Sequence, residues 1–266
     1  MTDIAVGETP SRADTRLCKV GGVCMLGAGA IYAVSAGLSL MIGPAPSGTE
    51  LYLRSVAQHL LVSRLNFGLW IVSDILLLPA VFALYLLLRP VAKRAMLVGS
   101  GLLVLFCVFD AAVTELQSLR LVAYAQYYAA ANDSGQQLAY VARAGHTLAV
   151  LPVATFISYA VSSLGLLIVS VVMLRAVFPK LAAYAGVIAS VEGIVGGFYP
   201  LFPSLAVFLI PSLIAFALWA LLSGRRLVSL PDSARRISAE PDGAANGSQP
   251  TRSETNSTSS VAGSRR

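Results

Sequence analysis

Four acidic residues lie within or at the end of long apolar runs, where an ionised side chain is costly: Asp74, Asp110, Glu115 and Glu192. An ionised carboxylate at the centre of a membrane span costs about 2.5–3.5 kcal/mol. No Lys, Arg or His lies within any of these runs to offset that cost. Such acids are either protonated and hydrogen-bonded to a neighbouring helix, or they face a water-filled cavity that carries a proton or cation or binds an amine.

The rise of a helix gives each acid an expected depth. Asp74 and Glu192 lie about 14–16 Å from the ends of their runs, close to the middle of a bilayer. Asp110 lies about 22 Å from the inner end of its run and belongs to the outer half. With Glu115 at the outer edge, the four acids predict a polar path from the middle of the membrane outwards. Hydrogen bonding to neighbouring helices is the alternative.

Glu115 has two further possible roles. Arg120 or Arg143 could pair with it at the outer edge, and His59 and His146 fall at the same interface. Two interfacial histidines in loops usually face solvent, so we predict no metal site. A haem would need axial ligands within the spans, and no base accompanies a nucleophile there. The sequence therefore predicts no cofactor and no catalytic residue.

The elements that must position these acids are membrane helices. Of the 266 residues, 56% are hydrophobic and only 12% are charged, about half the charged share of a soluble domain. A run such as 65–88, at about 1.5 Å per residue, covers the hydrocarbon core of about 30 Å. The predicted spans are residues 20–43, 65–88, 95–116, 147–174, 181–202 and 204–224.

The predicted fold is therefore all-α, a polytopic integral membrane protein with a six-transmembrane-helix bundle. We expect a cytoplasmic N-terminal segment at residues 1–18, the transmembrane domain at 19–226 and a disordered cytoplasmic tail at 227–266. The tail is rich in Ser, Gly, Asn and Arg and has too little apolar content to form a core.

Two connections carry helix-start patterns. Ser47 and Glu50 form a capping box that begins a short interfacial helix. Tyrosine- and alanine-rich residues after 116 predict an amphipathic helix that extends the third span out of the membrane. Asn132 breaks that helix, and Asp133 with Gln136 forms a second capping box.

Basic residues give the orientation. If the N-terminus is cytoplasmic, most of the 19 Lys and Arg residues lie on that side. The other side holds only Arg54, Arg64, Arg120 and Arg143. The positive-inside rule then places both termini in the cytoplasm. Because the basic residues flank apolar runs, we expect the lipid bilayer, and not nucleic acid, to be their partner.

Small residues recur at helical spacing. Gly29, Ala33 and Gly37 repeat every four residues in the first span, and Gly193 and Gly197 do so in the fifth. Such faces let helix backbones approach closely. They predict tight packing between helices and allow a homo-oligomer.

One short repeat hints at internal symmetry. Residues 32–35 and 159–162 both read Tyr-Ala-Val-Ser. Inverted three-helix halves would place the second span against the fifth and pair Asp74 with Glu192. Protonation of one acid would then relieve repulsion on the other.

Three segments resemble a bacterial family catalogued as domain of unknown function 4386. They read ALYLLLRPVAKRAMLVG at 83–99, FPKLAAYAGVIASVEGIVGG at 178–197 and WALLSG at 219–224. The resemblance covers roughly residues 15 to 226 and implies a six-helix protein of the bacterial inner membrane. It implies no activity and supplies no catalytic residue.

Two functions fit these observations. The first is an integral membrane protein without catalytic activity that acts through helix packing or partners. The alternative is a proton- or cation-coupled small-molecule transporter that uses the intramembrane acids. An intramembrane enzyme is disfavoured because no base–nucleophile or metal-ligand set is present.

Overall fold

The computed structural model describes residues 12–42, 48–176 and 178–239 of the chain. Within these residues the protein is all helical and has no strand. The chain divides into two compact units, Met1–Pro231 and Asp232–Arg266. The described part of the second unit is the end of one helix, residues 232–239, and the first unit holds all the other helices.

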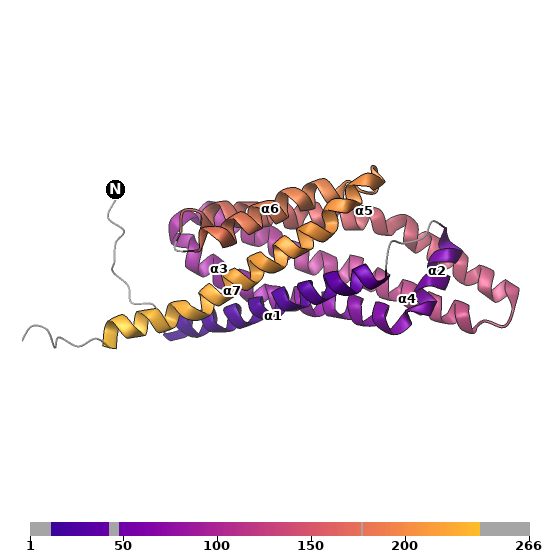
Figure 1. The fold of residues 1–266 in the computed structure, drawn as a ribbon, viewed down its shortest axis with the longest axis horizontal. Coiled ribbons are helices and arrows are strands. Elements are labelled where there is room, and N and C mark those ends of the chain that lie inside the picture. Colours follow the sequence, from indigo (N-terminus) through magenta and orange to yellow (C-terminus); the bar gives the residue numbers. More distant parts are fainter. Residues whose placement is uncertain (1–11, 43–47, 177, 240–266) are drawn as a thin grey trace, which may run out of the picture. The chain divides into compact units, whose positions relative to one another are not determined.

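Seven α-helices follow one another in the described residues (Figure 1). They are α1 (Arg12–Ile42), α2 (Thr49–Gln58), α3 (Leu60–Phe109), α4 (Leu116–Ala130), α5 (Ser134–Met173), α6 (Lys180–Gly197) and α7 (Leu209–Ala239). A π-helical segment, η1 (Asp110–Glu115), joins α3 to α4, and a 3-10 segment, η2 (Pro203–Phe208), precedes α7.

The described residues contain four helical stretches that are long and apolar enough to cross a membrane. They are Arg16–Met41, Leu60–Ala130, Ser134–Met173 and Pro203–Ser229. The predicted all-helical membrane class agrees with this result, but the count of six spans is not confirmed. The second and third predicted spans lie in one helical stretch. The fifth is α6, which has 18 residues and carries Lys180 and Glu192.

The long stretch that begins with α3 bends sharply at Ala92. There φ is −155° and ψ is 74°, so the backbone is not helical. Pro90 lacks the amide N–H that a helical hydrogen bond needs. Leu77 and Cys107, equally far from Ala92 along the chain, belong to the same hydrophobic cluster. The two arms of α3 therefore run antiparallel, as the predicted basic turn at residues 89–94 requires.

Helix α1 packs against α3 and lies beside α7 (Figure 1). A β-carbon added at Gly29 would lie only 3.1 Å from the carbonyl oxygen of Ala217 on α7. Of the predicted small-residue stripe, Gly29 is thus a packing residue. Ala33 is exposed, and nothing lies within 4 Å of a β-carbon added at Gly37.

Helix α6 packs against α5 and α7 through its glycines. A β-carbon at Gly186 would lie 2.7 Å from Cδ1 of Trp219, and one at Gly197 would lie 3.2 Å from Cβ of Tyr159. Gly193 faces serines of α5 and α7. These glycines serve packing within the chain, and association between copies stays a prediction.

A separate hydrophobic cluster joins α2, α4 and the first part of α5, with Leu53, Leu121 and Ala144 fully buried. The predicted extension of the third span is α4. The predicted capping of the next helix is confirmed, because the backbone N–H of Gln136 donates to Oδ2 of Asp133 at 3.3 Å. This second core positions the connections that lie beyond the predicted spans.

The predicted start of α2 needs correction. Gly48 is the N-cap, with φ at 103°, a left-handed conformation that glycine adopts readily. No side chain caps the helix, and Ser47 lies outside the described residues. Glu50, the expected partner in the capping box, accepts hydrogen bonds from Arg54 and Tyr128.

Helix α7 continues beyond Gly224, where the sixth predicted span ends, to Ala239. Leu227 is fully buried, and Gly22 of α1 provides the space it occupies. The segment predicted to be a disordered tail is thus helical over residues 227–239. The rest of the predicted tail, 240–266, lies outside the described residues, as do residues 1–11.

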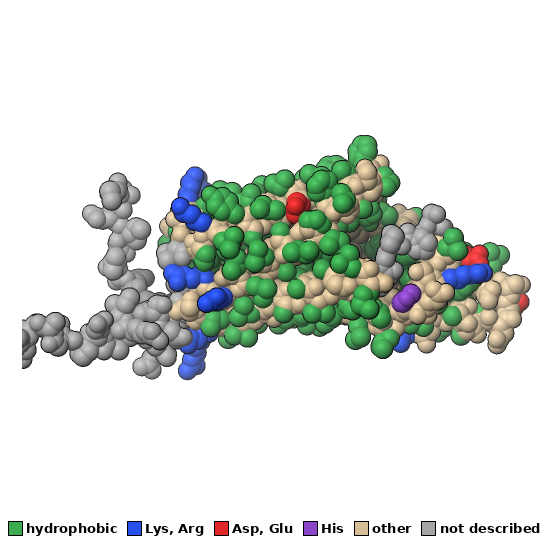
Figure 2. All heavy atoms as spheres, viewed as in Figure 1, with side chains coloured by type: hydrophobic (Ala, Val, Ile, Leu, Met, Phe, Trp, Pro, Cys, Tyr) green, Lys and Arg blue, Asp and Glu red, His purple; other side chains and the backbone are tan. Residues whose placement is uncertain are grey.

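The surface shows a band of hydrophobic side chains (Figure 2). Most of the Lys and Arg side chains in this view lie at one end of the band, and a few lie beyond its other end. Exposed basic residues of the two short connections are Arg89, Lys93, Arg94, Arg175 and Lys180. Large exposed apolar side chains, such as Val98 at 54% and Leu105 at 54%, point outward from the helices. Apolar side chains in this arrangement are compatible with lipid contact.

Candidate functional site

A cavity of about 340 Å³, with several polar groups in a mainly apolar lining, lies among the helices. The described residues that line it include two acids, Asp110 and Glu115, and eight serines and threonines. Aromatic side chains complete the walls: Tyr32, Phe67, Trp70, Phe106, Tyr159 and Phe216. No Lys, Arg or His belongs to this described lining.

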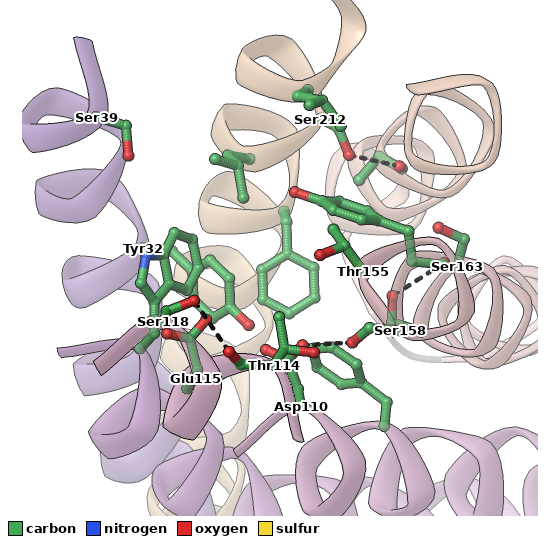
Figure 3. A pocket seen from close by; sticks show the side chains of 18 of the residues that line it. Tyr32, Ser39, Asp110, Thr114, Glu115, Ser118, Thr155, Ser158, Ser163 and Ser212 are labelled. Carbon is green, nitrogen blue, oxygen red and sulfur yellow. Dashed lines mark hydrogen bonds between the residues drawn. The ribbon is translucent and has the colours of Figure 1, made fainter. Parts of the chain in front are cut away.

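The π-helical segment η1 brings both acids to the same wall (Figure 3). In an α-helix, residues five apart point about 140° away from each other. Hydrogen bonds from i to i+5 widen the turn, so the fifth residue comes back to nearly the same face. Asp110, Thr114 and Glu115 all line the cavity as a result. The estimates from the sequence assumed a regular α-helix and therefore could not include this π turn.

Asp110 is held by a hydrogen bond from α5. Ser158 Oγ donates to Oδ1 of Asp110 at 2.5 Å, and both side chains are buried. The bond fixes the orientation of the carboxyl group at the cavity wall. Asp110 therefore combines the two predicted alternatives, since it is hydrogen-bonded to a neighbouring helix and also lines a cavity.

Glu115 is more buried than its position in the sequence suggests. It is 7% exposed, and its Oε2 has no hydrogen-bond partner. The predicted pairing with Arg120 or Arg143 is absent from the described ion pairs, and Arg120 donates to Gln117 instead. The π turn directs Glu115 into the cavity and away from the outer arginines.

Asp74 is almost completely buried, at 1% exposed, and neither of its carboxyl oxygens has a partner. It does not line the cavity, but it lies close enough to Asp110 for the two charges to interact. The bend at Ala92 explains this proximity, because the two acids are equally far from it along the chain. The structure thus places Asp74 behind the cavity wall.

Glu192 does not line the cavity. It lies half-buried on α6, and its Oε2 has no hydrogen-bond partner. Helix α3 packs mainly against α1 and α5, whereas α6 packs against α5 and α7. The acid neighbour of Asp74 is therefore Asp110, and the predicted pairing of Asp74 with Glu192 is not what the structure shows.

The short sequence repeat does have a structural counterpart. Tyr32 on α1 and Tyr159 on α5, the first residues of its two copies, both line the cavity. Tyr32 packs edge-on against Trp70, with ring centroids 4.8 Å apart, and against Phe216 at 4.4 Å. The repeat thus supplies two of the aromatic residues in the cavity wall.

A second cavity of about 470 Å³ adjoins the first. Phe67, Ser118 and Leu151 belong to the walls of both. Its remaining walls include the start of α2 and Tyr199, which follows α6. The second cavity therefore lies next to the first, on the side away from the basic connections.

The basic side of the cavity is closed by the main hydrophobic core. On α5, for example, Val169 and Met173 lie between the cavity residue Leu166 and the basic connection at Arg175. The same order holds on α1, where Met25 precedes Tyr32, and on both arms of α3 and on α6 and α7. Apolar packing thus separates the two acids from the basic end.

A polar network lies beyond the predicted spans, at α2 and α4. Tyr128 Oη donates to Oε1 of Glu50 at 2.9 Å, and Arg54 Nη2 donates to the same oxygen at 2.6 Å. The Tyr128 hydrogen bond and the Arg54 charge hold the pKa of Glu50 below its ordinary value. This network fastens α2 to α4 next to the second cavity.

The described residues contain no group of three or more His, Cys, Asp or Glu side chains able to hold a metal ion. His59 contacts the backbone oxygen of Ser55, four residues earlier in the chain. His59, His146 and Glu115 are thus not assembled into the metal site considered above.

In comparisons with known proteins, no family model, no curated protein and no solved structure matches this chain. The resemblance to the family of unknown function 4386 therefore stays a prediction. The geometry of the cavity is the basis for assigning a function.

Proposed function

We propose that this chain is a membrane transporter for a small molecule, coupled to a proton or another cation. The observation that carries the proposal is the cavity with two buried carboxyl groups, Asp110 and Glu115, and no basic residue in its described lining. A carboxyl group that is buried without a counter-charge favours binding of a proton or a cation. Both groups sit where a solute from the adjoining cavity would reach them.

The proposed topology has six spans with both termini in the cytoplasm. The spans are α1, the two arms of the bent stretch that begins with α3, α5, α6 and α7. At 18 residues, α6 is about 27 Å long, which nearly matches a hydrocarbon core of about 30 Å. The basic connections support a cytoplasmic location of that end. The resemblance supports the bacterial cytoplasmic membrane as its location.

In this topology the cavity faces the outside. The main hydrophobic core lies on its cytoplasmic side, while the second cavity adjoins it on the outer side. Transport then requires a second conformation in which the core opens and the outer side closes. Proton and cation compete for the same carboxyl groups, so binding of one favours release of the other. This competition provides the coupling.

A second candidate function is a membrane protein that transports nothing. The hydrogen bond from Ser158 to Asp110 favours it, because a satisfied carboxyl group can be purely structural. Neither proposal assigns a catalytic step to the cavity.

Proton flux in reconstituted vesicles tests the proposal. Vesicles containing the purified protein and an internal pH-sensitive dye receive candidate amines outside, and the internal pH is followed. We expect amine-dependent proton movement that Asp110→Asn abolishes. The matched control is Glu192→Gln, which changes a half-buried acid outside the cavity. Equal flux in empty vesicles and in vesicles with the protein would favour the second candidate.

A further inference from the structure

The cavity combines negative charge with aromatic surface. Asp110, Glu115 and Tyr32 all line the cavity (Figure 3), and the rings of Trp70 and Phe216, which also line it, both pack on Tyr32. Aromatic faces attract organic cations within about 6 Å of the ring centroid. Carboxylates bind ammonium groups by charge-assisted hydrogen bonds. The two kinds of group together favour a ligand that has a positive charge and an apolar body.

An unused hydrogen-bond acceptor marks where the charged group would bind. Oε2 of Glu115 lacks a hydrogen-bond partner, and the side chain is buried, at 7% exposed. Buried polar atoms of this kind are normally hydrogen-bonded. An ammonium group has several donors to offer and would satisfy this acceptor, whereas a carboxylate ligand has none and would be repelled by the two acids.

The size of the cavity narrows the choice. At about 340 Å³ it lies within the usual range of small-molecule sites, roughly 300–1,000 Å³, and is far larger than a single ion needs. A divalent metal would prefer several oxygen or nitrogen ligands around one point. The described residues contain no such cluster. The space fits an organic molecule of modest size.

We propose that the cavity binds an organic cation, an ammonium group attached to an aromatic or aliphatic body. The ammonium group lies between Asp110 and Glu115, and the body contacts Tyr32, Trp70 and Phe216. This inference rests on the proposed function in taking the cavity as the substrate site. It adds the chemical class of the substrate.

Tryptophan fluorescence provides a binding test that needs no transport. The chain has two tryptophans, Trp70 in the cavity wall and Trp219 in the main core. In Trp219→Phe, Trp70 is the sole tryptophan, and no hydrogen bond is lost because the indole nitrogen of Trp219 has no partner. The purified variant is titrated at neutral pH with phenethylamine, with 2-phenylethanol and with phenylacetate.

The three probes share a phenyl ring and differ in charge. We expect a saturable change of Trp70 fluorescence with phenethylamine. The affinities for the alcohol and the acid should be weaker than that for the amine by about tenfold or more. Adding Asp110→Asn or Glu115→Gln should weaken amine binding by about tenfold or more. Adding Glu192→Gln should leave it unchanged. Thermal melting of each variant checks that it is folded. If Asp110→Asn does not fold, Glu115→Gln alone tests the contribution of the acids to amine binding.

The results separate this inference from the proposed function. Equal affinity for the amine and the alcohol, or unchanged amine affinity in both acid variants, would overturn the inference. Amine binding without proton flux would refute transport and leave the binding site standing. Proton-coupled uptake of a neutral or anionic solute, without amine binding, would refute only the substrate class.

Discussion

Ser158 on α5 donates a hydrogen bond of 2.5 Å to Asp110 in the π-helical segment, joining two residues 48 positions apart in the chain. The bond connects two helices and orients an acid at the wall of the cavity. Ser158→Ala leaves the Asp110 carboxyl without this donor. We expect a loss of about 1–3 kcal/mol in the free energy of unfolding, measured in mixed micelles.

The control for that variant is Ser162→Ala, one turn further along α5. Ser162 donates at 3.1 Å to the backbone oxygen of Tyr159 in its own helix. Its loss should cost less than about 1 kcal/mol. If the two variants unfold alike, the bond to Asp110 does not stabilise the fold.

The π-helical segment makes a prediction about spacing. Deletion of the exposed residue Ala112 should convert η1 into an α-helix with Asp110 and Glu115 four positions apart, still on one face. Amine affinity, measured by Trp70 fluorescence, should then stay close to that of the unaltered protein.

Insertion of an alanine after Ala112 is the opposite change. The insertion turns Glu115 away from the cavity wall by about 100°. It should therefore weaken amine binding as strongly as Glu115→Gln does. A deletion that abolished binding would show that the π turn does more than place the two acids on one face.

Two glycines provide a matched test of helix packing. A β-carbon at Gly186 would lie 2.7 Å from Trp219, so Gly186→Ala should destabilise the protein by about 1–3 kcal/mol. Nothing lies within 4 Å of a β-carbon at Gly101, which is exposed on α3. Gly101→Ala should therefore be neutral or stabilise by about 0.5–1 kcal/mol. Thermal unfolding in detergent measures both, and equal melting temperatures would contradict the packing of α6 on α7.

The network at α2 and α4 predicts a pH effect. Because the pKa of Glu50 is lowered in the folded protein, its stabilising contribution is present above the ordinary glutamate pKa. That contribution is lost as the pH falls through the lowered value. Tyr128→Phe removes the largest cause of the shift, so the pKa of Glu50 should rise towards its ordinary value. Titration of the carboxyl carbon by NMR checks this.

Tyr127→Phe is the control for the titration. Tyr127 neighbours Tyr128 in sequence but stacks on Tyr140, with ring centroids 5.7 Å apart. Its hydroxyl should not influence Glu50. An unchanged titration of Glu50 in Tyr128→Phe would show that Arg54 alone causes the shift.

Reporter fusions test the proposed topology. The connection between α4 and α5 lies at the end away from the basic turns, so a fusion after Gly135 should be external. A fusion after Arg226 should be cytoplasmic. A cytoplasmic signal at Gly135 would reverse the orientation and with it the direction in which the cavity faces.

The sequence by itself determined the helical elements and several of their limits. Apolar runs fix where helices can bury their surface in lipid, and this property is local to each run. The start of α5 was also predictable, because Asp133 caps a backbone N–H only three residues away. The bend at residues 89–94 followed from a proline and three basic residues, whose effects are equally local.

The grouping of the acids was decided only by the tertiary structure. Distance along a helix gives the depth of a residue but not the direction in which it points. The π turn rotated Glu115 to the face of Asp110, and the bend at Ala92 brought Asp74 beside them. Glu192, whose predicted depth matches that of Asp74, lies apart from these acids because α6 packs on α5 and α7. Side-chain direction depends on helix distortions and on the choice of neighbouring helices, and apolar sequences specify both weakly.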